Sequence, residues 1–220
     1  METPIEKYTK EHSSIPNKAL DWVEKQTNIK TNYPRMLSGR ITGELLTLIA
    51  KMINAHHILE IGCFTGYSTI CLAEGIIGEG YVDSLEINDE LESLIRQGWE
   101  KAGISNKARL HIGDAIESIN NFVKEKRTFD MIYIDANKRE YLAYYKAVMP
   151  LLKSGGVIIA DDTMLGGKVY DTPLSTDKQT RGLLEFNDYV INDPGVELVM
   201  LPLRDGFKHN TKEIAYFHHK

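Results

Sequence analysis

The sequence predicts an α/β fold in which a mainly parallel, doubly wound sheet carries helices on both faces. Three observations support this prediction. Short apolar segments alternate with longer amphipathic ones from residue 57 onward, a glycine-containing loop follows the first apolar segment, and acidic residues follow several later ones. Repeated alternation of strands and helices favours parallel neighbours joined by crossover helices. At 220 residues, the chain is expected to form a single domain over residues 1–220.

The N-terminal part of the chain precedes the predicted sheet. Apolar residues recur at helical intervals over residues 17–26 and 41–53, and a proline-containing stretch at 31–34 separates them. Residues 1–40 are therefore predicted to form a helical cover over the core.

From residue 57 the predicted strands and helices follow one another in turn. The predicted strands are 57–61, 81–86, 109–112, 131–135, 157–160 and 196–203, and the predicted helices are 67–74, 89–102, 115–124, 141–152 and 181–192. Residues 166–178 are rich in Gly, Asp, Thr, Ser and Pro and lack periodicity. We interpret this segment as an active-site loop, because it follows a core strand.

Charge and composition narrow the classes of partner. The chain has 26 basic and 31 acidic residues and a formal charge of −5, which disfavours binding to nucleic acid. Cys63 and Cys71 have neither zinc-site spacing nor the density of a disulfide scaffold. No apolar run is long enough to cross a bilayer, and the N-terminus does not resemble a signal peptide. The predicted location is cytoplasmic, without a membrane partner.

The loop after the first strand predicts a nucleoside site. Gly62 and Gly66 lie four residues apart before a helix, where glycines let a ligand approach the backbone. Glu86 ends the second strand, where a carboxylate can accept both hydroxyls of a ribose. A dinucleotide fingerprint would require glycine where Phe64 and Tyr67 stand, so a pyrophosphate fits poorly. For the two glycines alone, an ordinary strand-to-helix turn is the simpler interpretation.

A cofactor without phosphate and with a positively charged sulfonium suits this loop, because Glu60 precedes it. We therefore predict S-adenosylmethionine as the cofactor. Asp114 and Ala115 follow the third strand and could flank the adenine. Asp114 stands before a helix, so helix capping is an equally good interpretation of that residue.

Acidic residues at two further strand ends predict a metal site. Asp135, Asp161 and Asp162 are expected to meet at the carboxyl edge of the sheet, where three carboxylates would repel one another. A hard cation such as magnesium, or manganese or calcium, would relieve this repulsion, and it would lower the pKa of a bound hydroxyl. Lys138 could accept the hydroxyl proton. For each aspartate alone, capping or a salt bridge with Lys138 or Lys168 is the competing interpretation.

Four segments carry a resemblance to a known family: Glu60 to Ser68, Ile134 to Lys138, Asp161 to Thr163, and Leu201 to Gly206. Over roughly residues 8–207, the chain resembles the cation-dependent O-methyltransferases, which include catechol and caffeoyl-coenzyme A O-methyltransferases. The resemblance implies a Rossmann-like class I methyltransferase fold with a seven-stranded sheet. It also implies that the acceptor is a small hydroxylated aromatic molecule of the catechol or caffeoyl type. By the same resemblance a homodimer is expected, and Ile5, Tyr8 and Ile15 would suit its interface.

The resemblance also assigns roles to single residues. Asp135, Asp161 and Asp162 match metal ligands, Lys138 matches the proposed base, and Asp135 is also expected at the cofactor. The positions that match the surroundings of the cofactor are Met36, Gly43, Glu60, Gly62, Phe64, Ser68, Glu86 and Ala115.

The chain departs from the family pattern at three places. Asp162 stands where the family usually has asparagine, and Leu165-Gly166 replaces a common Trp-Asn. After Gly206, a polar segment at 207–214 replaces the expected apolar final strand. The acceptor molecule therefore cannot be carried over from the family.

Three other functions remain as alternatives. A methyltransferase of the same fold acting on RNA or protein would share the glycine loop, but the acidic charge balance opposes it. A nicotinamide-dependent oxidoreductase would need the missing pyrophosphate glycines. A nucleoside-binding module without activity would need neither Lys138 nor three carboxylates.

Overall fold

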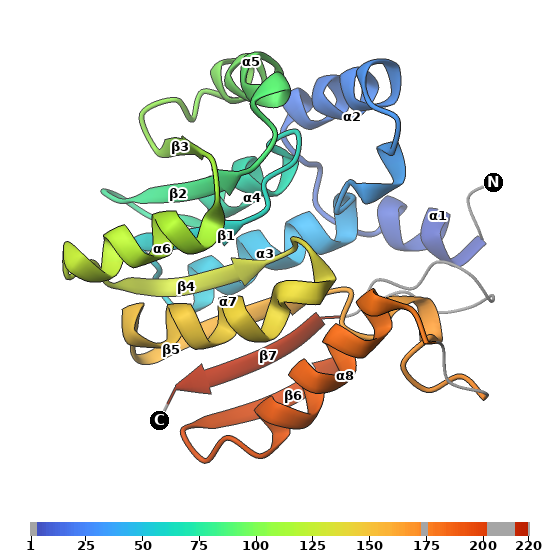
Figure 1. Ribbon diagram of the computed structural model, residues 1–220. Coiled ribbons are helices and arrows are strands. Elements are labelled where there is room, and N and C mark those ends of the chain that lie inside the picture. Colours follow the sequence, from blue (N-terminus) through green and yellow to red (C-terminus); the bar gives the residue numbers. More distant parts are fainter. Residues whose placement is uncertain (1–3, 173–175, 202–213, 220) are drawn as a thin grey trace.

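The computed structural model describes residues 4–172, 176–201 and 214–219. Seven strands form one sheet in the order β3-β2-β1-β4-β5-β7-β6 (Figure 1), which confirms the predicted α/β class and strand number. The pairs within β3-β2-β1-β4-β5 are parallel, and β7 runs antiparallel to both β5 and β6. The strands are β1 (His57–Ile61), β2 (Tyr81–Glu86), β3 (Ala108–Ile112), β4 (Phe129–Ile134), β5 (Leu152–Asp161), β6 (Val196–Leu201) and β7 (Ile214–His219).

Helices cover both faces of the sheet (Figure 1). The α-helices are α1 (Pro4–Glu11), α2 (Lys18–Lys30), α3 (Arg40–Met52), α4 (Tyr67–Gly75), α5 (Glu92–Ala102), α6 (Ala115–Lys124), α7 (Tyr141–Val148) and α8 (Lys178–Ile191). Short 3-10 turns are η1 (Pro34–Met36), η2 (Asp89–Leu91), η3 (Lys138–Glu140), η4 (Met149–Leu151) and η5 (Leu165–Gly167).

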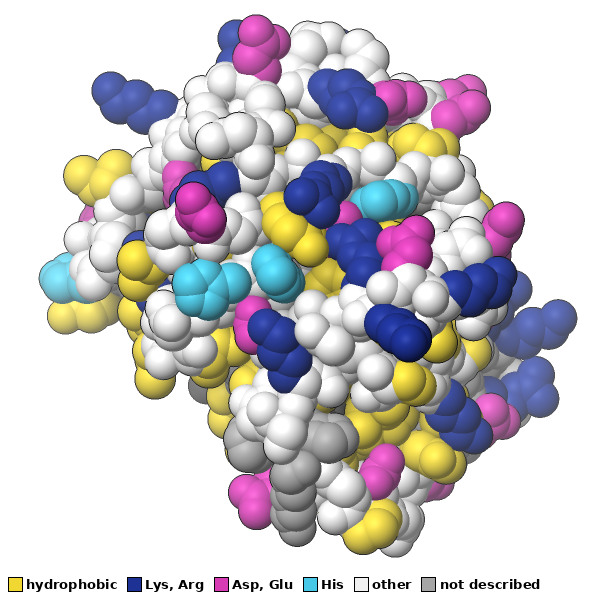
Figure 2. Space-filling view, turned by 90° about the vertical axis from the view of Figure 1, so that its left-hand side faces the viewer, with side chains coloured by type: hydrophobic (Ala, Val, Ile, Leu, Met, Phe, Trp, Pro, Cys, Tyr) yellow, Lys and Arg dark blue, Asp and Glu magenta, His cyan; other side chains and the backbone are white. Residues whose placement is uncertain are grey.

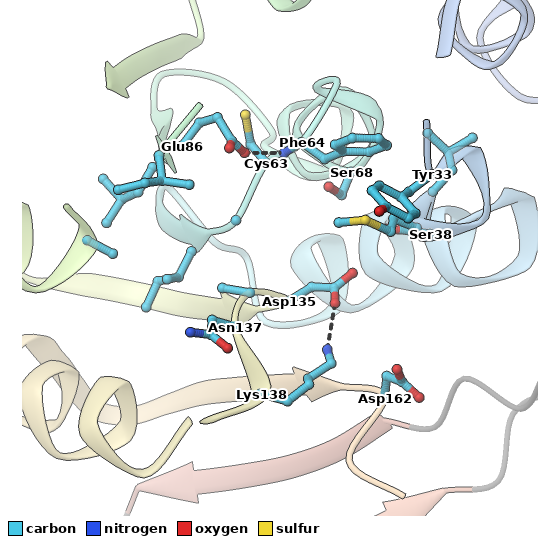
Figure 3. Close-up of a pocket in the computed structure, with 18 of the residues that line it drawn as sticks. Tyr33, Ser38, Cys63, Phe64, Ser68, Glu86, Asp135, Asn137, Lys138 and Asp162 are labelled. Carbon is cyan, nitrogen blue, oxygen red and sulfur yellow. Dashed lines mark hydrogen bonds and ion pairs between the residues drawn. The ribbon is translucent and has the colours of Figure 1, made fainter. Parts of the chain in front are cut away.

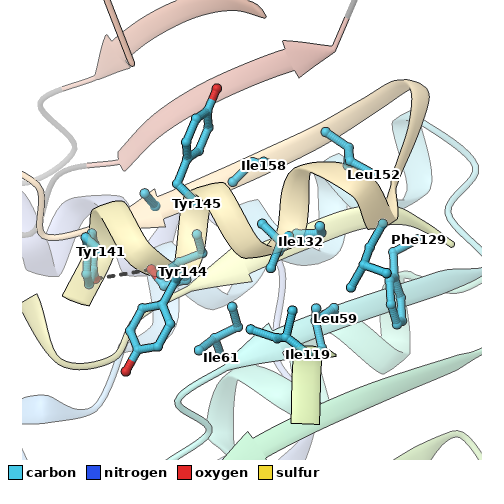
Figure 4. Packing of buried hydrophobic residues seen from close by; sticks show 14 of the residues in the cluster. Leu59, Ile61, Ile119, Phe129, Ile132, Tyr141, Tyr144, Tyr145, Leu152 and Ile158 are labelled. Atoms are coloured by element: carbon cyan, nitrogen blue, oxygen red, sulfur yellow. Dashed lines mark hydrogen bonds between the residues drawn. The ribbon is translucent and has the colours of Figure 1, made fainter. Parts of the chain in front are cut away.

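The central strands have buried side chains on both faces, and alternate residues enter different cores. Ile132 and Ile134 of β4 pack with residues of α6, α7 and α8, whereas Met131 and Tyr133 pack with residues of α2, α3, α4 and α5. Figure 4 shows Ile132 beside Ile119 of α6 and the tyrosines of α7. A side-chain period of two explains this division. It explains why these strands are continuous apolar runs in the sequence.

Most predicted elements are confirmed, and the differences lie at turns. The predicted helix 141–152 ends at Val148, because Pro150 follows and η4 leads directly into β5. The helix α1 was not predicted, since residues 4–11 read only as a polar start. The predicted polar segment at 207–214 lies outside the described residues except for Ile214, which begins β7. A final strand is therefore present at 214–219, and its replacement by a polar segment was wrong.

The N-terminal ends of the parallel strands lie at the edge of the sheet opposite the glycine loop. Figure 2 shows a face on which Lys, Arg and His side chains are interspersed with acidic ones. Arg127 pairs with the buried Asp83 and stacks on Phe122, and Lys153 pairs with Asp130 at 2.6 Å. Arg127 is therefore part of the packed structure.

No helix in the described part of the chain is long and apolar enough to span a membrane.

Candidate active site

A cavity of about 750 Å³ opens at the carboxyl ends of the parallel strands (Figure 3). Ligands of doubly wound sheets bind in this position, and the volume lies in the usual range for small-molecule sites. Predicted site residues that line it are Met36, Gly62, Phe64, Ser68, Glu86, Asp114, Ala115, Asp135, Lys138 and Asp162. The structure places four others outside this lining: Gly43, Glu60, Gly66 and Asp161.

The backbone N–H groups of the loop between β1 and α4 donate hydrogen bonds to acceptors in β2 and in the loop itself. Gly62 and Cys63 both donate to the Leu85 carbonyl, at 3.0 and 3.1 Å, and Gly66 donates to the Cys63 carbonyl at 2.8 Å. Phe64 donates its N–H to Glu86 Oε2 at 2.7 Å. These four N–H groups are engaged within the protein. This geometry adds to the case against a pyrophosphate, which would need such donors.

Gly62 is required by close packing between two strand ends. Its φ is +88°, and a Cβ atom there would lie 2.3 Å from the backbone oxygen of Asp135. The sequence interpretation gave this glycine the task of admitting a ligand. The structure gives it another task, which is to bring the end of β1 against the end of β4.

Gly43 and Gly66 also serve packing, and their predicted contact with the cofactor stays a prediction. A Cβ at Gly43 would lie 2.6 Å from Cys71 Sγ, where α3 crosses α4. Gly66 has φ +82°, and a Cβ there would lie 2.6 Å from Trp99 Nε1. Both glycines therefore set the position of α4 behind the cavity wall.

Glu60 is fully buried beneath the loop. Its Oε2 accepts hydrogen bonds from Thr69 at 2.5 Å and from Ser84 at 2.7 Å. Burial raises the pKa of Glu60 to about 7, and hydrogen bonds from Ser68, Thr69 and Ser84 oppose the rise. Glu60 therefore links β1 to α4 and β2, and its predicted contact with the amino-acid end of a cofactor has no counterpart in the cavity lining.

Glu86 stands at the end of β2 and faces the cavity (Figure 3). Its two oxygens accept N–H groups from Phe64 and from Asn88, the latter at 3.0 Å, which fixes the carboxylate. Burial raises the pKa of Glu86, and these backbone hydrogen bonds counter that effect. The remaining lone pairs can accept the two hydroxyls of a ribose.

Asp114 has the capping role that was one of its two interpretations, and its contact with an adenine stays a prediction. Its Oδ1 accepts the N–H of Glu117 at 2.9 Å, so it caps α6, and it also lines the cavity beside Ala115.

Lys138 lies at the opposite end of the cavity from Glu86 (Figure 3). Its Nζ donates to Asp135 Oδ1 at 2.9 Å, to Tyr141 Oη at 2.5 Å and to the Asp161 carbonyl at 3.1 Å. Burial lowers the pKa of Lys138, but Asp135, then Tyr141, Asp162 and Asp161, together raise it well above its usual range. The side chain is therefore an ammonium held in place by three acceptors, which opposes its predicted role as a base.

The three predicted metal ligands do not converge. Asp161 is fully buried, and its carboxylate accepts Tyr133 Oη–H at 2.8 Å and the N–H of Asp162 at 2.8 Å. Asp135 holds the Lys138 ammonium at the place where an ion was expected. Within the described ranges, no three His, Cys, Asp or Glu side chains are placed to hold a metal ion. Lys168, the other lysine considered, pairs with Asp177 at 3.7 Å.

Sequence reasoning missed several residues of the cavity wall. Asn137 and Tyr144 both donate to Glu140 Oε2 at 2.8 Å, and all three line the cavity. Asn137 lies three residues after the end of β4 and Glu140 ends η3, so their place in the turn behind a strand end was an available signal. Other lining residues that were not predicted include Tyr33, Arg35, Ser38, Cys63 and Gln179. The first three come from the segment before α3, whose placement on the cavity depends on tertiary packing.

The sheet order, the loop after β1 and the carboxylate at the end of β2 are typical of nucleoside-binding α/β proteins. Residues 10–212 match the family described as O-methyltransferase. Caffeoyl-CoA O-methyltransferase 5 of Nicotiana tabacum is 32% identical over 210 residues, which cover 90% of this chain and 87% of that protein. Caffeoyl-CoA O-methyltransferase of Medicago sativa is 35% identical over 181 residues, covering 78% and 72%.

Solved structures agree with this match. The O-methyltransferase from Bacillus cereus, in complex with SAH, superposes with a TM-score of 0.91 at 28% identity, covering 100% of this chain and 98% of that one. The chain belongs to the O-methyltransferase family. It is accordingly an enzyme, which excludes the oxidoreductase and the module without activity.

Proposed function

We propose that the protein transfers the methyl group of S-adenosylmethionine to a hydroxyl of a small hydroxylated aromatic molecule. One observation carries this proposal: a single cavity joins Glu86, which suits a ribose, to the Asp135–Lys138 pair, which suits a reacting oxygen. The SAH complex of the Bacillus cereus relative and the caffeoyl-CoA relatives support it.

The residues present fit this cofactor. Glu86 is a fixed carboxylate for the ribose hydroxyls, and Asp114 and Ala115 lie next to it for the base. Ser68, Met36 and Asp135 line the stretch toward Lys138 and would surround the amino-acid end. When bound, S-adenosylmethionine supplies an electrophilic methyl group on a sulfonium.

In the proposed reaction the S–CH₃ bond breaks and an O–CH₃ bond forms, while the hydroxyl proton leaves to solvent. Lys138 is an ammonium, so it would stabilise the oxygen as negative charge develops on it. Asp135 and Tyr141 hold Lys138 in position. The cavity walls place donor and acceptor in line, which is the main requirement of methyl transfer.

The predicted divalent cation has no place in this proposal. The donor arrangement does not fit an ion, because the Asp161 carboxylate is turned toward Tyr133 and Asp135 holds the ammonium. The roles proposed above use only side chains of the chain.

The test is a methyl-transfer assay with labelled S-adenosylmethionine and a panel of catechols and caffeoyl esters, with magnesium, with manganese and with EDTA. We expect transfer in all three conditions. Lys138→Met should lower kcat by about 100-fold or more, since removal of one electrostatic donor in an active site costs on this order.

Lys146→Met, on α7 outside the cavity lining, is the matched control and should keep normal turnover. Binding of S-adenosylmethionine without transfer to any acceptor would contradict the proposed acceptor class. Transfer that EDTA abolishes would show that an ion takes part after all.

A further inference from the structure

A hydrogen-bonded cluster on the cavity wall has no task in the proposed reaction. Glu140 Oε2 accepts hydrogen bonds from Asn137 Nδ2 and from Tyr144 Oη, each at 2.8 Å, and all three residues line the cavity. Asn137 follows β4, Glu140 ends η3 and Tyr144 lies in α7, so three successive segments converge on one carboxylate. Two donors fix the direction of this carboxylate, and a fixed acceptor on a cavity wall can select a donor on a ligand.

The orientation of the Asn137 amide is set by two contacts. Its Oδ1 accepts the N–H of Arg139 at 3.3 Å, which caps η3, and its Nδ2 donates to Glu140. A backbone N–H only donates and a carboxylate only accepts, so the two ends of the amide are not interchangeable. Figure 3 shows the Asn137 amide turned away from the Lys138 ammonium. The cluster therefore lies apart from the reacting end of the cavity.

Tyr144 is a permanent donor to Glu140. Its side chain is buried, and burial, the hydrogen bond to Glu140 and the charges of Glu140 and Asp114 raise its pKa above its usual range. The charge of Asp114 acts on Tyr144 because the start of α6 packs against α7. The cluster therefore lies beside Asp114 and Ala115, where the base of the cofactor is expected.

The second oxygen of Glu140 is available to a ligand. Among residues 4–172, 176–201 and 214–219, no group donates a hydrogen bond to Glu140 Oε1, and the side chain is exposed on the cavity wall. An ionised carboxylate accepts hydrogen bonds and cannot donate one. Adenine presents an amine at position 6 of the purine, whereas a 6-oxo purine presents a carbonyl oxygen there. Glu140 Oε1 suits the amine and opposes the oxygen.

We propose that Glu140 Oε1 accepts a hydrogen bond from the exocyclic amine of adenine and thereby selects the adenine form of the cofactor over its 6-oxo form. Asn137 and Tyr144 are positioning residues, because they act through Glu140. This inference rests on the proposed function, since it takes S-adenosylmethionine as the cofactor. Asp114 is the other carboxylate beside this part of the cavity, and its Oδ1 is engaged in capping α6.

The experiment measures binding by calorimetry for three ligands that differ only in the purine. They are S-adenosylhomocysteine, the S-inosyl compound and the S-(purine ribosyl) compound, which lacks the amine and keeps both ring acceptors. In the unaltered protein we expect the purine compound to bind about 10-fold more weakly than S-adenosylhomocysteine and the inosyl compound about 100-fold more weakly, the range for a hydrogen bond to a charged group that is lost or left unpaired.

Glu140→Gln should reduce both ratios to within about fivefold, because an amide can accept from the amine or donate to the carbonyl oxygen. Tyr144→Phe removes one of the two donors to Glu140 and should give intermediate ratios. Each ratio compares ligands on the same variant, so it does not depend on the folded fraction. Glu100→Gln, at an exposed position on α5 outside the cavity lining, is the matched control and should keep the full ratios.

Equal binding of the three ligands to the unaltered protein, or ratios that Glu140→Gln leaves unchanged, overturns the role of Glu140. Ratios that survive in Glu140→Gln and collapse in Asp114→Asn assign the amine to Asp114 and overturn it as well. Ratios unchanged in Tyr144→Phe overturn the positioning role of Tyr144. All these outcomes leave the proposed function intact, whereas failure of S-adenosylhomocysteine itself to bind overturns the proposed function.

Discussion

At the scale of single residues, the loop between β1 and α4 is held by contacts between residues that lie far apart in the chain. Glu60 lies in β1, and Gly62 and Gly66 lie in the loop after it, yet Glu60 and Gly66 are outside the cavity lining. Their tasks depend on contacts with distant residues such as Trp99 and Ser84, which no local pattern contains. Glu86 was predicted from its place at a strand end, and the lining contains it, because strand ends are readable from alternation alone.

The charge state of Lys138 could not be predicted from local sequence either. The sequence placed a lysine three residues after Asp135, but whether it is a base or an ammonium depends on burial and on every nearby charge. In the fold, Lys138 Nζ donates to three acceptors, one of which is the Asp161 carbonyl from another strand. These contacts favour the ammonium form of Lys138.

The buried Glu60 makes a prediction about stability and pH. Its pKa is about 7 in the folded protein, compared with 4.5 for a free glutamate. The folded state therefore holds a proton that the unfolded state has lost between these values, so this residue's stabilising contribution is present below pH 4.5 and is lost as the pH rises through 7. A shift of this size corresponds to roughly 3 kcal/mol. Glu60→Gln should therefore be more stable than the unaltered protein at pH 8, and the two should converge near pH 5.

Urea unfolding at a series of pH values between 5 and 8 measures this difference. Glu90→Gln, which changes an exposed carboxylate, is the control and should follow the unaltered protein. Parallel profiles for Glu60→Gln and the unaltered protein would show that Glu60 is already ionised in the fold at neutral pH.

At the scale of elements, strands β1 and β2 and helix α6 were predicted with their exact bounds, because they combine a clear period with clear flanking turns. The differences occur where turn chemistry ends an element early, as at Pro150, or where an element is short and polar, as in α1. The close packing of α4 against α3 and α5 also depends on Gly43 and Gly66, and local sequence does not reveal these contacts.

Gly66 allows this need to be measured. It combines φ +82° with a neighbour, Trp99, that an added Cβ would approach to 2.6 Å, whereas Gly78 has φ +79° with nothing within 4 Å. Gly78→Ala should cost about 1 kcal/mol of unfolding free energy for the backbone alone. Gly66→Ala should cost about 1 to 3 kcal/mol more, because α4 must move from α5. Urea denaturation gives both values, and similar costs would show that the contact with Trp99 relaxes freely.

At the scale of the whole molecule, the five parallel strands and their helices follow from the alternating pattern, and the last part of the sheet does not. In chain order β6 precedes β7, but in the sheet β7 lies between β5 and β6. The polar residues before Ile214 obscured this strand, and an antiparallel insertion has no crossover helix to announce it in the sequence.

This topology makes β7 necessary for holding β6. Strand β6 pairs with β7, and β7 pairs with β5, whose Ile158 and Ile159 are fully buried. Truncation after residue 213 should therefore release β6, expose the edge of β5 and cost at least about 5 kcal/mol, which corresponds to a fall in Tm of roughly 10 to 20 °C for a protein of this size. Val199→Ala, at a half-exposed position of β6, is the mild control and should change Tm by only a few degrees. Hydrogen exchange should show loss of protection in β5 and β6 first, with β1 and β4 keeping theirs; a truncated protein that melts at the original temperature would mean that β6 is held by α8 without β7.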